Sequence, residues 1–144
     1  MSNAMQASKV INGTYGRLWF QGAELTSVKS FECKQKINYE DIKQAGKLNK
    51  SRKMVGYELA GTFTLNKIDD TVAAAVCAGI NAGIQPTLTL IGVLADPSSY
   101  GETRVQINGI TIDNIILMKF EAGKLGEEEI SFEAETYQFL DQIT

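Results

Sequence analysis

The chain has 144 residues, of which 44% are apolar and 22% are charged, and its formal net charge is -3. This length and composition are typical of one globular domain with a single core. The sequence contains no histidine, which excludes Ser-His and Cys-His nucleophile pairs and imidazole metal ligands. The negative net charge argues against sequence-independent binding to nucleic acid, which normally requires a basic surplus.

Several features predict the compartment and the extent of the domain. No segment reaches the ~18 consecutive apolar residues of a membrane span, and no signal peptide opens the chain, so we expect a cytoplasmic protein without membrane contact. The cysteines, Cys33 and Cys77, lack CxxC spacing and are expected to be reduced and buried. Residues 1–4, which precede a second methionine, are interpreted as an expression-tag remnant. Residues 5–144 are expected to form a single domain.

The first half of the chain shows the periodicity of β-strands. Residues 17–20 and 23–25 flank a Gln-Gly pair, whose glycine can supply the positive φ of a tight hairpin turn. Residues 28–39 and 54–66 alternate between apolar and polar side chains. This alternation predicts two strands, each with one buried and one solvent-exposed face.

Residues 40–53 interrupt this alternation and predict a long basic loop. Loops of this length in compact domains are usually functional or disordered. The segment has a single glycine and no GxxxxGK[ST] motif, so nucleotide binding is not indicated. Two interpretations remain, a solvated mobile loop or an arm that orders against a neighbouring subunit. The basic residues of the loop are Lys43, Lys47, Lys50, Arg52 and Lys53.

The second half of the chain predicts one helix and further strands. Apolar side chains recur every four positions over residues 70–81, and Asp69 and Asp70 can cap the start of this helix. Residues 87–94 form an apolar β run. These features predict one α-helix that lies against a sheet.

Three more strand signals follow. Residues 104–112 contain an Asn-Gly pair, the strongest hairpin signal in the chain. Residues 114–120 form an apolar β run, and residues 129–135 alternate between apolar residues and carboxylates. The sequence therefore predicts a mainly β fold, a barrel or sandwich of about seven strands with one flanking helix near residues 70–81.

Clustered carboxylates are the only group that resembles a chemical site. Paired carboxylates can perform acid-base chemistry or bind a hard cation, but alternate positions on an open strand are normally solvated. We therefore predict no catalytic, cofactor or metal site. The cluster consists of Glu127, Glu128, Glu129, Glu133 and Glu135. The aromatic residues of the strand-like runs are expected to be in the core; they are Trp19, Phe20, Phe31, Tyr57, Phe63, Phe120 and Phe132.

Charge is distributed unevenly along the chain. Residues 29–53 contain eight basic and three acidic residues, whereas residues 121–144 contain seven acidic residues and one lysine. Copies of the chain could match these two segments in a head-to-tail contact.

The order of several glycine-containing and β-strand motifs resembles the tail tube protein of contractile-tailed phages and of defective prophages of the PBSX type. The resemblance extends over nearly the whole chain from about residue 10. The motifs are Gly16-Arg17-Leu18-Trp19-Phe20 with Gly22, Lys29-Ser30-Phe31-Glu32, Arg52-Lys53-Met54-Val55-Gly56, Gly61-Thr62-Phe63-Thr64-Leu65, Thr87-Leu88-Thr89-Leu90, Arg104-Val105 and the glutamate-rich residues 127–132.

This resemblance implies a structural protein and no enzyme. A β-barrel-like subunit would form rings, six copies to a ring, and stacked rings would form the inner tube within a contractile sheath. The implied partners are other copies, tail sheath and baseplate proteins, and DNA only in transit. Assembly would take place in the cytoplasm of a bacterial host, and the product would be a virion or a phage-like tail particle.

The resemblance also suggests roles for the two charged segments. Residues 40–53 are the candidate arm between rings, with Lys43, Lys47, Lys50, Arg52 and Lys53 as contact candidates. Glu129, Glu133 and Glu135 are candidates for an acidic face or the lumen of the tube, where negative charge would let DNA slide.

Other functions are consistent with the same strands. A tube protein of a secretion machine or a ring protein near a baseplate belongs to the same structural class. A small β-barrel that binds an apolar ligand belongs to another class, and it would need a roomy apolar cavity. A carboxylate-dependent hydrolase is the third alternative, although nothing in the sequence pairs two acids in a protected setting.

Overall fold

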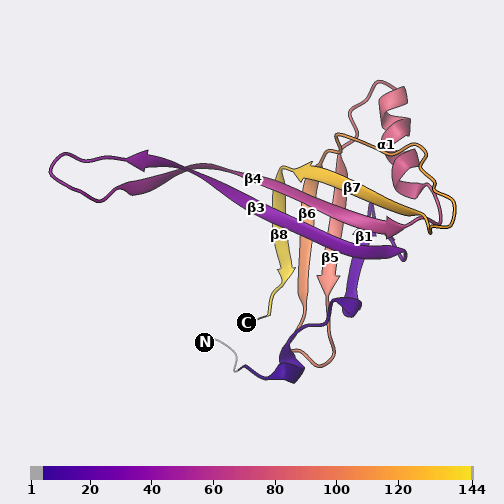
Figure 1. Cartoon of the computed structure of the whole chain (residues 1–144), viewed down its shortest axis with the longest axis horizontal. Helices are drawn as coiled ribbons and strands as arrows, with labels where there is room; N and C mark the ends of the chain where they lie inside the picture. The colour runs from indigo at the N-terminus through magenta and orange to yellow at the C-terminus, as the bar shows by residue number, and fades with distance from the viewer. Residues whose placement is uncertain (1–4, 144) are drawn as a thin grey trace.

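Two antiparallel β-sheets form the body of the protein (Figure 1). The computed structural model describes residues 5–143; the predicted tag remnant at residues 1–4 and residue 144 lie outside the described residues. The five-stranded sheet has the order β2 (Ala23–Glu24), β1 (Gly16–Phe20), β5 (Leu88–Leu94), β6 (Thr103–Ile110) and β8 (Thr136–Asp141). The three-stranded sheet has the order β3 (Val28–Ile42), β4 (Ser51–Asn66) and β7 (Glu127–Ala134).

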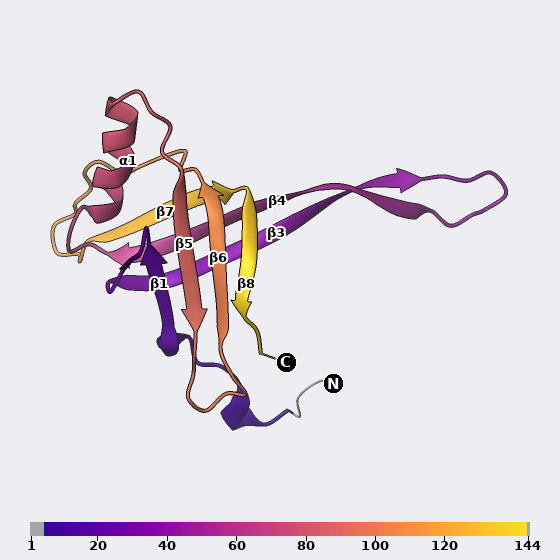
Figure 2. The same ribbon diagram turned by 180° about the vertical axis from the view of Figure 1, so that it is seen from behind.

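The two sheets pack as a sandwich and do not close into a barrel. Figures 1 and 2 show that the strands of the three-stranded sheet cross those of the five-stranded sheet. Side chains from both inner faces interdigitate in such a packing. The predicted mainly β fold with one helix is thus confirmed in its sandwich form, with eight strands in the described part of the chain.

Helix α1 (Thr71–Asn81) confirms the helix predicted at residues 70–81. It covers one end of the sandwich (Figure 2), where Val72 and Val76 are buried. The N–H of Thr71 donates to Oδ1 of Asp69 at 3.2 Å, whereas the carboxylate of Asp70 accepts from Lys67 Nζ at 2.5 Å. Within residues 5–143, no helix is long and apolar enough to cross a bilayer.

Aromatic rings fill the core between the sheets. Phe63 of β4 is completely buried, and its ring centroid lies 6.0 Å from that of Phe132 on β7. Phe31 of β3 stacks on Phe132 at 6.2 Å. The backbone approaches Phe132 closely at Gly61, where an added Cβ would lie 2.6 Å from Cζ of that ring. The close packing of the core therefore depends on the absence of a side chain at Gly61.

The core prediction for the aromatic residues is confirmed in part. Phe20, Phe63 and Phe132 are buried, whereas Trp19 and Phe31 are half-buried. Tyr57 and Phe120 are exposed, so their assignment to the core is wrong. Tyr57 lies on the part of β4 that extends beyond the body, and Phe120 lies outside every strand.

Two strand predictions in the second half were wrong, and one strand was missed. The Asn-Gly pair makes no hairpin, because β6 continues through it. Gly109 (φ +67°) instead forms a bulge, since Leu88 pairs with Ile110 while Leu90 pairs with Ile107. Residues 114–120 form no strand. The edge strand β8 was not predicted.

Candidate assembly surfaces

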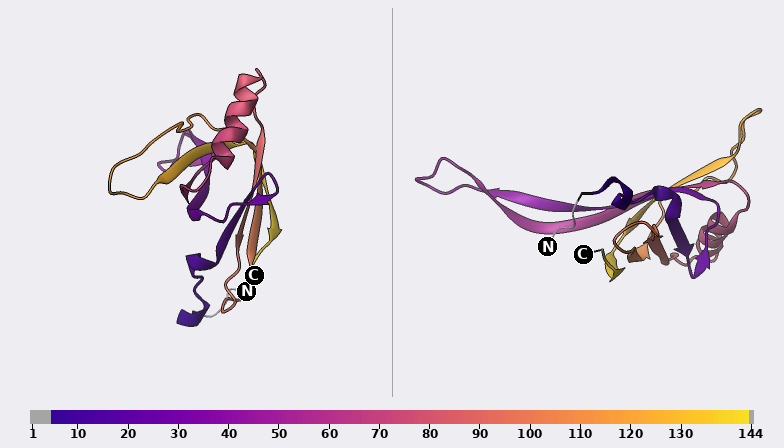
Figure 3. Two further views of the ribbon diagram at one scale, coloured as in Figure 1. Left: turned by 90° about the vertical axis from the view of Figure 1, so that its right-hand side faces the viewer. Right: turned by 90° about the horizontal axis from the view of Figure 1, so that it is seen from below.

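The hairpin of β3 and β4 extends far beyond the body as an arm, defined here as residues 36–58 (Figures 1 and 3). Pairing continues to Ile42 and Ser51, so the loop predicted at residues 40–53 is too long. Only residues 43–50 connect the strands. The strand periodicity is lost here because both faces of the outer arm are exposed and no longer need to alternate.

The structure brings the predicted basic residues together on the outer part of the arm. Lys50 Nζ lies 3.3 Å from Asp41 Oδ2, and the guanidinium of Arg52 lies 4.1 Å from the ring centroid of Tyr39. Cation–π contacts of this kind fix the orientation of an otherwise flexible side chain. The residues of this basic tip are Lys43, Lys47, Lys50, Arg52 and Lys53.

One face of the arm is apolar and exposed. The register places Ile37 opposite Tyr57, on the same face as the core residues Phe31 and Phe63. The core-facing row of side chains therefore continues from the body onto the arm. The exposed apolar residues of the paired part of the arm have relative exposures of 40–58% and are Ile37, Tyr39, Ile42, Met54, Val55 and Tyr57, of which Ile42 lies on the opposite face of β3 from Ile37 and Tyr39. Leu48 in the connecting loop is fully exposed.

The body does not cover this apolar face because the five-stranded sheet ends at β8. Tyr137 of β8 donates a hydrogen bond from its hydroxyl to Gln35 Oε1 at 3.0 Å. Gln35 immediately precedes the arm, and β8 is the edge strand of its sheet. A continuous apolar surface of this kind is typical of a protein contact.

Two of the three predicted acidic-face residues lie on one strand face. Glu129 and Glu133 are exposed on the outer face of β7, on either side of Ser131. Glu135 follows the end of β7, where its N–H donates to the carbonyl of Asn108 at 3.1 Å. It therefore does not continue the strand that carries the other two carboxylates.

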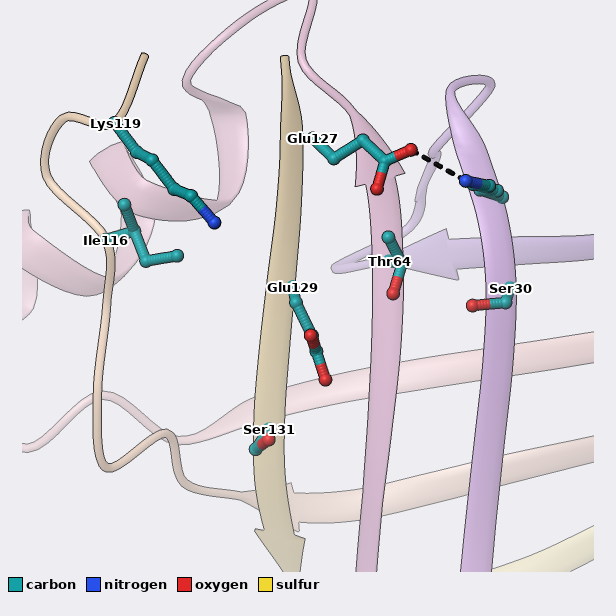
Figure 4. Close-up of a pocket in the computed structure, with 8 residues that line it drawn as sticks. Ser30, Thr64, Ile116, Lys119, Glu127, Glu129 and Ser131 are labelled. Carbon is teal, nitrogen blue, oxygen red and sulfur yellow. Dashed lines mark hydrogen bonds and ion pairs between the residues drawn. The ribbon is translucent and has the colours of Figure 1, made fainter. Parts of the chain in front are cut away.

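The remaining glutamates of β7 serve different contacts. Glu127 accepts a hydrogen bond from Lys29 Nζ of β3 at 2.6 Å (Figure 4). Lys29 lowers the pKa of Glu127, so this contribution to stability is present at neutral pH and lost as the pH falls through the folded-state pKa. Glu128 points inward, and its Oε2 lies 3.4 Å from Lys67 Nζ. The glutamate run is thus divided between both faces of the sheet.

A second apolar surface lies on the long segment between β6 and β7. We call residues 113–126 the strap. Figure 4 shows Ile116 and Lys119 beside β7, on the side away from β4. With Lys29 and Glu129 they line a polar cavity of about 380 Å³. The exposed apolar residues of the strap have relative exposures of 76–95% and are Leu117, Met118, Phe120 and Leu125.

Sequence reasoning did not identify the strap as a surface. Residues 114–120 were predicted to form an apolar strand, and Phe120 was expected in the core. Only the length of the segment and the two glycines and two charged residues that follow Phe120 could have indicated a loop.

Two open grooves lie along β3 between the sheets. Their volumes are about 600 Å³ beside Phe31 and Val28 and about 480 Å³ beside Cys33 and Phe139. Burial raises the pKa of the Cys33 thiol. A ligand-binding barrel would enclose its cavity within closed strands, whereas both grooves are open along the unpaired edge of β3. This geometry favours a contact between proteins over an enclosed ligand.

Comparison with other proteins identifies the fold and the family. Solved structures that share the fold include the cap of the anti-feeding prophage, with a TM-score of 0.73, 11% identity and coverage of 99% of this chain and 97% of that chain. The sheath-tube complex of the PVC extracellular contractile injection system in its extended state has a TM-score of 0.70, 10% identity and coverage of 98% and 100%.

Two sequence relatives come from Bacillus subtilis (strain 168). The phage-like element PBSX protein XkdM is 27% identical over 143 residues, which cover 98% of this chain and 97% of the relative. The uncharacterized protein YqbM is 28% identical over 142 residues and covers 97% of each chain. The family model described as phage tail tube protein matches residues 3–141. The chain therefore belongs to the phage tail tube protein family.

Proposed function

We propose that the chain assembles with copies of itself into stacked rings, six copies to a ring, which form the inner tube of a contractile phage or phage-like tail. Membership of the tail tube family supports a structural role. The observation that carries the proposal is the apolar face of the arm, because a row of core-type side chains continues onto it without cover from the body. Burial of such a face between copies would be favourable.

Tail components are the proposed partners of this tube. The solved structures with the same fold come from a tube-terminating cap, a sheath-tube complex and a baseplate. We infer that sheath and baseplate proteins contact the assembled rings. The subunit would need no cofactor and no catalytic group, and it would assemble in the host cytoplasm before it becomes part of a tail particle.

The acidic face of β7 is the proposed lining of the lumen. Glu129 and Glu133 extend from the same exposed face of the three-stranded sheet. Like charge would keep a DNA backbone from adhering to this face during passage. Glu135 remains a candidate for this role, although it lies beyond the end of the strand.

Electron microscopy tests the tube directly. We expect the purified protein to form rings or tubes as its concentration rises, since each copy presents an apolar arm that its own body does not cover. A protein that stays monomeric at every salt and protein concentration would contradict the proposed function.

The basic tip of the arm is the proposed contact between rings, and charge reversal tests it. We expect the triple substitution Lys47→Glu, Lys50→Glu and Arg52→Glu to leave the subunit folded, because all three side chains are exposed. Stacking of rings should fall by at least tenfold in the amount of sedimenting tube, because three attractive contacts become repulsive.

A matched control keeps the charge at the same positions. The variant Lys47→Arg, Lys50→Arg and Arg52→Lys should stack like the unmodified protein, as measured by sedimentation and electron microscopy. Normal tubes from the glutamate variant would exclude the tip as the contact between rings.

A further inference from the structure

The strap has the sequence of a strand but not its structure. Five of the six residues 115–120 are apolar, yet none of them belongs to a strand in the described chain. Four large apolar side chains of the strap are almost fully exposed. A segment with strand-type composition and no pairing partner is a local conflict that a bound partner can resolve. The strap therefore has the properties of a surface that is covered after assembly.

The apolar face of the arm has matching dimensions. Its β3 portion, residues 36–42, would span about 23 Å, and residues 115–120 would span about 20 Å if extended, at ~3.3 Å per residue. Figures 1 and 2 show the arm and the strap at opposite ends of the long axis of the molecule. The strap therefore does not cover the arm of its own chain.

The arm and the region around the strap differ in charge. Residues 36–58 contain six basic and three acidic residues. Residues 113–129, the strap and the start of β7, contain five acidic and two basic residues. Glu127 is already paired with Lys29 and Glu128 is buried near Lys67, which leaves three acidic residues against two lysines around the strap. Two apolar surfaces at opposite ends of one molecule, one beside a basic tip and the other without a surplus of like charge, fit a heterologous contact that repeats from copy to copy.

We propose that the strap of one copy is the receptor for the apolar face of the arm of the next copy. This inference rests on the proposed function, because it assigns the partner surface of the same arm. Leu117, Met118 and Phe120 of the strap pack against Ile37, Tyr39 and Tyr57 of the arm. The exposed side chains of the strap are then covered by the arm of the next copy.

We test the proposed contact with two variants. Each variant disrupts one of the two surfaces, either the arm or the strap. The arm variant is Tyr57→Asp, and the strap variant is Leu117→Asp with Phe120→Asp. All three side chains are exposed, so the subunit should keep its circular dichroism spectrum and its urea midpoint. Ile84→Asp is the control, because Ile84 lies outside both surfaces and its exposure falls between that of Tyr57 and that of Leu117.

The expected result in analytical ultracentrifugation is specific to a heterologous contact. Each variant alone should be monomeric at concentrations where the unmodified protein and Ile84→Asp form rings or tubes. An equimolar mixture of the two variants should form a pair of copies and nothing larger. The intact arm of the strap variant can dock on the intact strap of the arm variant, but each remaining end of the pair carries a substituted surface.

Two other results overturn the inference in distinguishable ways. If the strap variant assembles like the unmodified protein while the arm variant does not, the arm docks elsewhere, and the proposed function stands. If the unmodified protein never assembles, the proposed function and the receptor both fail.

Discussion

Replacement of Gly61 by alanine should destabilise the fold by about 3 kcal/mol, at the upper end of the range for overpacked cores. A Cβ at this position would lie 2.3 Å from the carbonyl oxygen of Glu32, 2.6 Å from Cζ of Phe132 and 3.0 Å from the Cα of Cys33. Two of these neighbours are backbone atoms of β3, so relief requires that the paired strands move apart. The loss should appear as a lower urea midpoint in an unfolding curve monitored by Trp19 fluorescence.

The same strand offers a control for this substitution. Gly56 also lies in β4, and an added Cβ would meet no atom within 4 Å. Gly56→Ala should therefore leave stability unchanged or raise it by up to about 1 kcal/mol, because alanine restricts the unfolded chain. Similar urea midpoints for the two variants would show that the approach of Phe132 to β4 is not tight.

The sequence predicted the fold well where one face of an element is buried, because apolar residues must then recur with the period of a strand or a helix. Strands β3, β4 and β7 alternate where they pack on the core, and α1 repeats where it covers the sandwich. The hairpin predicted at the Asn-Gly pair of β6 was wrong because this dipeptide indicates only a preference for positive φ. A hairpin turn and a bulge at Gly109 both satisfy that preference.

The candidate surfaces were predicted only in part for a related reason. The basic tip could be predicted from its charge alone. Its position on a paired hairpin could not, because apolar and polar residues no longer alternate where both faces of a strand are exposed to solvent. For the strap, the sequence predicted a strand where the structure has none. Residues 114–120 were predicted as a strand with Phe120 in the core, whereas Ile115 packs against the core and Phe120 is exposed. An apolar sequence pattern does not distinguish burial within a subunit from burial between subunits.

Replacement of Phe63 by alanine should cost about 3–5 kcal/mol of folding free energy, the range for buried aromatic residues. Its ring is fully buried and lies 6.0 Å from that of Phe132, so truncation removes apolar burial and leaves a cavity between the sheets. Domains of this size have a total stability of about 5–15 kcal/mol. The variant should therefore unfold at a much lower urea concentration.

Phe120→Ala is the matched control, because it removes the same kind of side chain from the strap, where Phe120 is 86% exposed. Its removal should change the urea midpoint of the monomer very little, yet it should weaken assembly if the strap is the receptor for the arm. Phe63→Ala should weaken assembly only in proportion to the fraction of unfolded subunit. A large loss of monomer stability in Phe120→Ala would mean that the strap packs on its own body, and its exposed rings would then need no second copy to cover them.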